Sequence, residues 1–173
     1  MSLYGRVQWE AVLSVIRRFC LLMLLFPGWA ALAQPSAPND PTFTFFQAIQ
    51  RGDIPVVTRF LDRGMSVDAR LLGIPALYFA QMSNQPESMK VLIKRGADVH
   101  ARYGPVQRTA LHDAALKGRT ECVRLLLEAG ADPNAANKYG HTPLSYAINP
   151  PLPLSPSQNS AEIAALLREH GAR

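Results

Sequence analysis

One unit of about 33 residues recurs along this chain, and this recurrence restricts the possible folds more than any other feature. The clearest copy runs from Thr109 to Ala135. It reads as a Thr-x-Leu-His turn, an Ala-rich helix, a Gly-containing turn, a Leu-rich helix and a Gly-Ala-Asp-x-Asn-Ala loop. The turn pattern at 109–112 returns one unit later, at 142–145. Because a helix-turn-helix of this size cannot bury both of its apolar faces alone, we predict that several copies stack side by side.

Matches to the Gly-Ala-Asp loop indicate how many copies there are. Gly130 has a counterpart one unit earlier at Gly96, which in turn has a counterpart one unit earlier at Gly64. Toward the C-terminus the next Gly-Ala pair ends at Ala172, and its distance from Ala131 is greater than one unit. The last copy therefore contains an insertion, which falls in the Pro-rich segment 149–160. We therefore predict four repeats, at about 41–69, 70–101, 102–135 and 136–173.

The order and spacing of these residues resemble the ankyrin repeat, and the resemblance covers nearly all of the chain beyond residue 40. It implies an all-α solenoid of four helix-turn-helix repeats with short finger loops. In such repeats the His of the turn pattern is structural, so His112 is expected to bond across its turn to neighbouring repeats. Cys122 stands at a core aliphatic position and is expected to be a buried, unreactive thiol.

The second repeat departs from the pattern at its turn. Pro75 and Tyr78 stand where Thr and His are expected, so the Thr–His hydrogen bonds are lost. We expect Pro75 to preorganise the first helical turn instead. Asn84 replaces the glycine between the two helices and is expected to adopt the left-handed conformation of that glycine.

Two arginines stand where the inner repeats carry apolar residues. Arg59 occupies the position of Val91 in the next repeat, and Arg168 occupies the position of Ile93. An inner repeat covers these positions with its neighbour, whereas an end repeat has no neighbour there. We expect both arginines to face water as caps of a complete array.

Residues 1–33 have the features of a secretory signal peptide. A basic stretch precedes an uncharged apolar run at 19–33, which contains Pro27 and ends in a small-x-small motif at Ala31–Ala33. This run is shorter than the ~20 apolar residues that a spanning helix requires. We predict export with cleavage after Ala33, a flexible lead-in at 34–40 and a periplasmic or secreted product. A twin-arginine signal and an uncleaved membrane anchor remain open alternatives.

The charge of the exported chain argues against nucleic-acid binding. Removing residues 1–33 leaves 15 basic and 12 acidic residues, a net charge of +3, and the basic residues are scattered along the chain. Nucleic-acid binding calls for a contiguous basic stripe or a recognisable motif. We therefore expect no nucleic-acid partner.

The sequence lacks the patterns of a catalytic or metal site. It contains no H-x-x-x-H, C-x-x-C or G-x-S-x-G motif and no phosphate-binding glycine loop. After cleavage Cys122 would be the only cysteine, so no intramolecular disulfide could form. We predict a non-catalytic protein without a metal or cofactor.

In ankyrin stacks the finger loops and first helices form a concave surface that binds proteins, and the resemblance places contact residues on this chain. They are Arg70, Leu71 and Leu72 in the first finger, Arg102, Tyr103, Val106 and Arg108 in the second, Lys138, Tyr139 and His141 in the third, and Gln50, Arg51, Met82, Ser83, Leu116 and Lys117 along the first helices. Tyr and Arg are enriched at binding hot spots, and the local positive excess indicates an acidic partner face. We predict a monomer that binds another protein through this surface. The alternative is that these residues are solvated loop tips.

The exported ankyrin architecture resembles small periplasmic ankyrin proteins of Gram-negative bacteria, some of which accompany catalases in peroxide defence. The resemblance implies a periplasmic adaptor or protective partner. Two alternatives are an immunity or inhibitor protein that occludes a toxin and a signal-anchored scaffold at the membrane surface. The Pro-rich segment at 149–160 is either a docking element for the partner or a tolerated loop.

Overall fold

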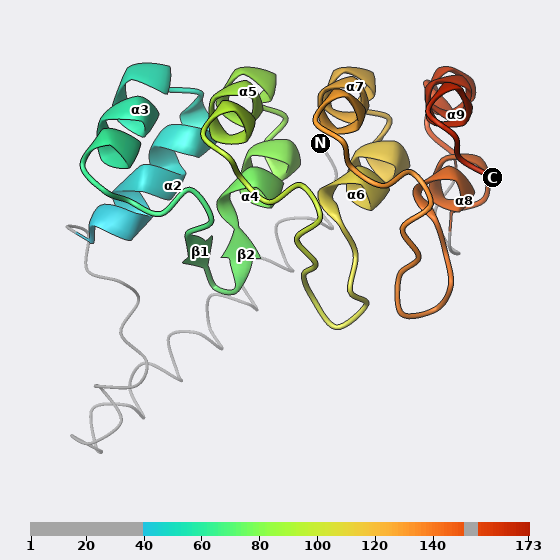
Figure 1. The fold of residues 1–173 in the computed structure, drawn as a ribbon, viewed down its shortest axis with the longest axis horizontal. Coiled ribbons are helices and arrows are strands. Elements are labelled where there is room, and N and C mark those ends of the chain that lie inside the picture. Colours follow the sequence, from blue (N-terminus) through green and yellow to red (C-terminus); the bar gives the residue numbers. More distant parts are fainter. Residues whose placement is uncertain (1–39, 151–155) are drawn as a thin grey trace, which may run out of the picture. The chain divides into compact units, whose positions relative to one another are not determined.

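The computed structural model describes residues 40–150 and 156–173, and their regular structure is almost entirely helical (Figure 1). The helices are α2 (Pro41–Arg51), α3 (Ile54–Asp62), α4 (Ala76–Met82), α5 (Pro86–Lys94), α6 (Ala110–Lys117), α7 (Thr120–Glu128), α8 (Pro143–Ile148) and α9 (Ser160–Glu169), and the strands are β1 (Arg70–Leu71) and β2 (Ile74–Pro75). The predicted signal peptide at 1–33, the lead-in up to residue 39 and residues 151–155 of the Pro-rich segment lie outside the described residues.

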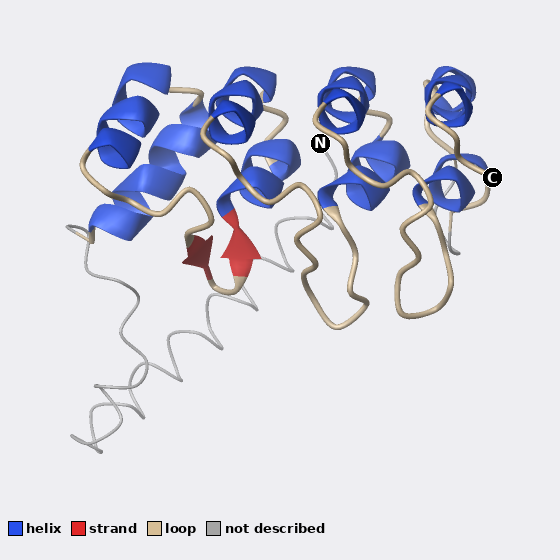
Figure 2. Ribbon diagram, viewed as in Figure 1, coloured by secondary structure: helices blue, strands red, loops and turns tan. Residues whose placement is uncertain are grey.

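The described helices form four pairs that stack side by side. The first helices pack on one another in the order α2, α4, α6, α8, and the second helices do so in the order α3, α5, α7, α9. Figure 1 shows these two sets as two layers, with the loops between repeats extending beyond the layer of first helices. In Figure 2 the short hairpin of β1 and β2 is the one sheet among the described residues. The predicted all-α stack of helix-turn-helix repeats is confirmed.

The ends of α2 show how local sequence sets the helix boundaries. Asp40 precedes the helix, and its Oδ1 accepts a hydrogen bond from the Thr42 amide at 2.8 Å. The helix ends at Gly52, whose φ of 71° suits a residue without a Cβ. Asn84 and Gly118 lie at the matching turns with φ values of 55° and 72°. The prediction that Asn84 takes the left-handed conformation of the turn glycine is confirmed.

The prediction that Pro75 preorganises the first helical turn of its repeat is wrong. Pro75 is the residue before α4 and has an extended backbone (φ −64°, ψ 149°), so it does not belong to the first helical turn. It instead forms β2 with Ile74 and pairs with Arg70 of β1. The physical reason is that a proline φ suits an extended strand as well as a first helical turn.

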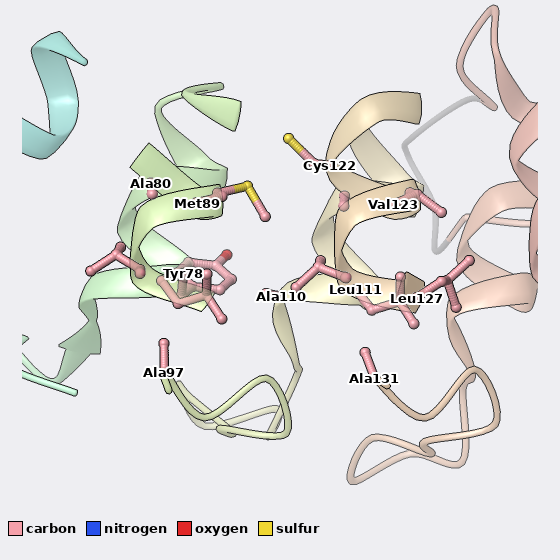
Figure 3. Packing of buried hydrophobic residues seen from close by; sticks show 14 of the residues in the cluster. Tyr78, Ala80, Met89, Ala97, Ala110, Leu111, Cys122, Val123, Leu127 and Ala131 are labelled. Atoms are coloured by element: carbon pink, nitrogen blue, oxygen red, sulfur yellow. The ribbon is translucent and has the colours of Figure 1, made fainter. Parts of the chain in front are cut away.

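The core is continuous through the four repeats. The largest fully buried apolar side chains are those of Phe45, Phe46, Ile49, Met89, Leu92, Leu111, Leu126, Ile163 and Leu167. Figure 3 shows Met89 and Cys122, from successive second helices, among these packed side chains. Cys122 is 1% exposed, and this burial raises the pKa of its thiol. The predicted burial of Cys122 is therefore confirmed.

The two predicted cap arginines face water. Arg59 on α3 and Arg168 on α9 are exposed, whereas Val91 and Ile93 of α5 pack against the core. A second helix at an end of the described stack thus carries a charge where an inner one carries an apolar side chain.

The residue before each later second helix links its repeat to the preceding one. Three such side chains donate hydrogen bonds to carbonyls at the end of the preceding first helix: Gln85 to Gln50 O at 3.1 Å, Arg119 to Gln81 O, and Asn159 to Gly118 O at 2.8 Å. Helix ends leave their last carbonyls without intrahelical partners. Each repeat therefore satisfies part of the helix end of its predecessor.

Gln81 is a polar side chain in this apolar stack. It is 0% exposed, and neither atom of its side-chain amide has a hydrogen-bond partner among the described residues. The matching residues in the first and third repeats are Ile49 and Ala115. Leaving a buried polar group unsatisfied costs about 1–3 kcal/mol.

Methionine has a shape similar to that of glutamine but no polar amide to leave unsatisfied. We therefore expect Gln81→Met to raise the free energy of unfolding, measured by urea denaturation, by about 1–2 kcal/mol. Gln50→Met is a matched control, because Gln50 is exposed on α2 and only its backbone carbonyl takes part in the link from Gln85. A decrease in stability for Gln81→Met would contradict the prediction.

Candidate protein-binding surface

Three loops connect the four repeats, and Figure 1 shows them extending from the same side of the stack. We call residues 70–75, 102–108 and 136–141 the first, second and third fingers. The first closes through β1 and β2, and the second closes through an antiparallel bridge between Tyr103 and Arg108. The third closes through a hydrogen bond from the Asn137 amide to His141 O at 2.9 Å.

The second and third fingers are bonded to each other. The Lys138 amide donates to Val106 O at 3.0 Å. Arg102 Nη1 donates to Ala136 O at 2.7 Å and to Gln107 O, within its own finger, at 3.2 Å. The backbone of the third finger therefore depends on the position of the second.

His112 joins α6 to the base of the third finger. Its Nδ1 accepts a hydrogen bond from the Thr109 amide at 3.2 Å and lies 2.9 Å from the Thr109 hydroxyl. Because Nδ1 is an acceptor, Nε2 carries the ring proton and donates to His141 O at 3.0 Å. Burial lowers the pKa of His112, which favours this neutral ring. The predicted structural role of His112 across its turn is confirmed.

A buried carboxylate lies at the base of the second finger. Asp113 of α6 accepts hydrogen bonds from the hydroxyl of Tyr103 at 2.8 Å and from the hydroxyl of Tyr78 of α4. Arg108 Nε lies 3.2 Å from Asp113 Oδ1, close enough for an ion pair but not aligned as a hydrogen bond. Arg108 Nη2 donates to the Tyr103 hydroxyl at 3.1 Å. We call these four residues the Asp113 cluster.

The electrostatics of the Asp113 cluster favour neutral phenols beside one ion pair. Burial raises the pKa of Tyr103 to about 12 and also raises the pKa of Tyr78, and both hydrogen bonds to Asp113 add to the effect. Burial opposes the charge of Arg108, yet the Asp113 carboxylate raises its pKa overall. At neutral pH the two phenols are therefore donors and Arg108 is a cation.

Large apolar side chains are exposed at the finger tips. Leu72 in the first finger is 94% exposed and Tyr139 in the third is 67% exposed, and Met82 at the end of α4 is also exposed. Leu72 has a φ of 52°, a conformation that is costly for a bulky residue. Such strain often accompanies functional sites.

Some cations of the second helices have carboxylate partners, whereas Arg59, Lys94 and Arg168 on these helices have none within 4.0 Å among the described residues. On the second helices Lys90 pairs with Glu87 at 2.8 Å, and Arg95, just after α5, pairs with Asp62 at 2.6 Å. On the fingers, no carboxylate of residues 40–150 or 156–173 lies within 4.0 Å of a charged nitrogen of the exposed residues Arg70, Arg102 and Lys138. The fingers thus present positive charge beside exposed apolar side chains.

The structure divides the predicted contact residues into two groups. The exposed ones are Gln50, Arg51, Arg70, Leu72, Met82, Arg102, Lys117, Lys138, Tyr139 and His141, and the partly exposed ones are Leu71, Ser83, Tyr103, Val106, Arg108 and Leu116. Tyr103 and Arg108 are only partly exposed and belong to the Asp113 cluster, so much of each side chain already has a partner within the chain. Sequence reasoning missed Asp113 and Tyr78. The Tyr in place of the usual turn His was the available signal, because its hydroxyl reaches farther than an imidazole.

In the part of the chain that the structure describes, no group of three His, Cys, Asp or Glu side chains is placed to hold a metal ion. Over the same residues, no helix combines the length and apolar character needed to cross a membrane.

Comparisons with known proteins agree with the repeat pattern. A family model described as "Ankyrin repeats (many copies)" matches residues 92–147. Protein phosphatase 1 regulatory subunit 27 of Mus musculus is 39% identical over 108 residues, which cover 61% of this chain and 68% of that protein. A putative ankyrin repeat-containing protein of Treponema pallidum (strain Nichols) is 37% identical over 131 residues, 74% of this chain and 41% of that protein.

A longer protein is also similar to this chain. Ankyrin repeat, SAM and basic leucine zipper domain-containing protein 1 of Neofelis nebulosa is 39% identical over 123 residues, which cover 67% of this chain. The match spans only 25% of that protein, as the match to the Treponema protein spans 41%. Similarity to these two relatives therefore covers only part of their length.

Proposed function

Because this chain belongs to the ankyrin-repeat family, whose repeats are protein–protein interaction modules, we propose that its fingers and first helices bind an acidic partner protein in the periplasm. The observation that carries the proposal is the row of exposed apolar and cationic side chains on the fingers. Leu72 and Tyr139 offer apolar area to a partner, and Arg70, Arg102 and Lys138 have no carboxylate within 4.0 Å among the described residues. Apolar anchors beside unpaired cations suit a partner that presents apolar side chains among carboxylates.

The names of the relatives support a protein partner. The Mus musculus relative is named a regulatory subunit of protein phosphatase 1, and it is similar to this chain over 61% of the chain. A regulatory subunit works by binding another protein. This similarity supports a role in protein binding. The side chains of the fingers determine which partner is bound.

The proposed location rests on the sequence of residues 1–33. Their basic stretch, short apolar run and small-x-small motif at Ala31–Ala33 favour export and cleavage. Mass spectrometry of the protein from cell fractions tests this: a periplasmic product that begins at Gln34 supports it. A full-length product in the membrane fraction would instead favour the signal-anchored scaffold.

Affinity capture tests the binding surface. We expect Leu72→Ser combined with Tyr139→Ser to reduce partner recovery at least tenfold, because truncating one hot-spot residue costs about 2 kcal/mol or more. Charge reversal by Arg70→Glu with Lys138→Glu should weaken binding most at low salt, where surface charges are least screened. Tagged exported protein is used as bait in envelope extracts, and recovery of the main partner is quantified.

Lys94→Glu is the matched control for charge, because Lys94 is exposed on α5, away from the fingers. Recovery that is unchanged in both finger variants would refute the surface. A partner that copurifies stoichiometrically and proves to be a toxin would favour the immunity role over the adaptor role.

A further inference from the structure

We propose that Asp113 is a positioning residue that clamps the second finger against α4 and α6 and, through the second finger, orders the third. The clamp consists of contacts within the chain and forms without a partner. Its consequence for binding rests on the proposed function, because the third finger carries Lys138 and Tyr139.

The first step is the contact between Asp113 and both arms of the second finger. Tyr103 and Arg108 stand opposite each other at the base of the finger, and their backbones exchange hydrogen bonds of 3.0 and 3.2 Å. Both side chains reach the Asp113 carboxylate, which is 6% exposed. One carboxylate on a helix thus holds both ends of the loop.

The second step is the contact with the preceding repeat. Tyr78 of α4 donates to Asp113, and its ring lies against that of Tyr103 with 3.5 Å between ring centroids. The second finger is therefore fixed both to its own repeat and to the one before it. The first and third fingers have no corresponding buried carboxylate among the described residues, where Asp113 is the only buried acidic residue.

The third step transmits the position of the second finger to the third. Val106, between the two clamped residues, accepts the hydrogen bond from the Lys138 amide at 3.0 Å. Arg102, next to Tyr103, donates to Ala136 O at 2.7 Å. If the second finger moves, both bonds to the third finger are lost.

A charged carboxylate is needed for this clamp. Arg108 is half-buried and requires a counter-charge, while two phenols require acceptors. An asparagine has a single side-chain oxygen and no charge, so it cannot serve all three groups. Asp113→Asn therefore removes the clamp while almost preserving the side-chain volume.

Amide hydrogen exchange of the full chain tests the clamp without any partner. In Asp113→Asn we expect the Tyr103, Arg108 and Lys138 amides to exchange at least about tenfold faster. The Ala97 and Ala131 amides, which bond to Leu92 O and Leu126 O at the ends of α5 and α7, should exchange as in the unchanged protein. Asp132→Asn is the matched control, because Asp132 is an exposed acid of the same repeat.

Two results would overturn the clamp. One is an unchanged Lys138 amide in Asp113→Asn, and the other is an equal acceleration at Ala97 and Ala131, which would indicate general destabilisation. If Asp113→Asn does not fold, Tyr103→Phe removes one hydroxyl and keeps the ring. The Arg108 and Lys138 amides must then exchange faster in Tyr103→Phe, and unchanged rates would equally overturn the clamp.

The same variants separate the clamp from the proposed function. If both proposals are correct, Asp113→Asn reduces partner recovery and also reduces the protection of the Lys138 amide from exchange. Faster exchange at Lys138 with full partner recovery would support the clamp and count against a role for the third finger in binding. Failure of the unchanged protein to capture any partner would count against the proposed function. The exchange experiment would still test the clamp, because it needs no partner.

Discussion

Replacing His112 with alanine is expected to lower the free energy of unfolding by about 3–4 kcal/mol. The ring is 0% exposed and fills space between α6 and the third finger. Its loss leaves a cavity and removes the partner of the Thr109 amide and one of the two donors to His141 O, which keeps its bond from the Asn137 amide. Leaving the buried Thr109 amide unsatisfied costs about 1–3 kcal/mol, which adds to the lost packing.

Urea denaturation followed by circular dichroism measures this effect. His141→Ala is the matched control, because His112 bonds to the backbone carbonyl of His141 and not to its exposed side chain. We expect the control to change the stability by less than about 0.5 kcal/mol, as for most surface substitutions. A loss below about 1 kcal/mol for His112→Ala would show that water or a shifted backbone replaces the ring.

Phe46→Ala is expected to cost about 3–5 kcal/mol, the usual range for a buried Phe. Phe46 lies on α2 and is 1% exposed. Its ring makes edge-on contacts with the rings of Phe45 and of Phe79 on α4, with 5.7 Å and 5.1 Å between ring centroids. It therefore joins the first repeat to the second. Because a repeat is stabilised mainly by its nearest neighbours, the loss should fall on the first repeat.

The measurement for Phe46→Ala combines urea denaturation with hydrogen exchange. We expect α2 and α3 to lose protection while α7 and α9 keep theirs, and the unfolding transition to broaden as cooperativity weakens. Phe43→Ala is the matched control, since Phe43 lies on the same helix but is only partly buried. An equal loss for the two variants would argue that Phe46 has no special place between the repeats.

Much of the fold follows from local patterns that a single repeat already contains. The spacing of apolar residues, the turn glycines and Asn84 predict helix pairs, and the structure has them. The structural role of His112 was predictable from the resemblance to the ankyrin repeat, and the structure has its bonds to Thr109 and to His141 O of the next repeat. Pro75 was misplaced because its φ fits both a strand and a first helical turn.

The contact residues were predictable only as positions along the fingers. The sequence treats Tyr103 and Tyr139 alike, as tyrosines on successive loops, yet Tyr139 is 67% exposed and Tyr103 bonds to Asp113. The difference depends on Tyr78, which belongs to the preceding repeat, and on Asp113, which lies in the helix after the finger. No local pattern connects these three residues.

The sequence by itself determined the repeat, the helix pairs and the set of side chains on the fingers, because each depends on residues within about one repeat of one another. The tertiary structure alone decided which of those side chains are available to a partner. That choice depends on how far each repeat is shifted and rotated on the one before, since a displacement of a few ångströms decides whether Tyr78 reaches Asp113 or Arg102 reaches Ala136. Periodicity predicts that the repeats stack, but side-chain packing over all four of them sets these distances.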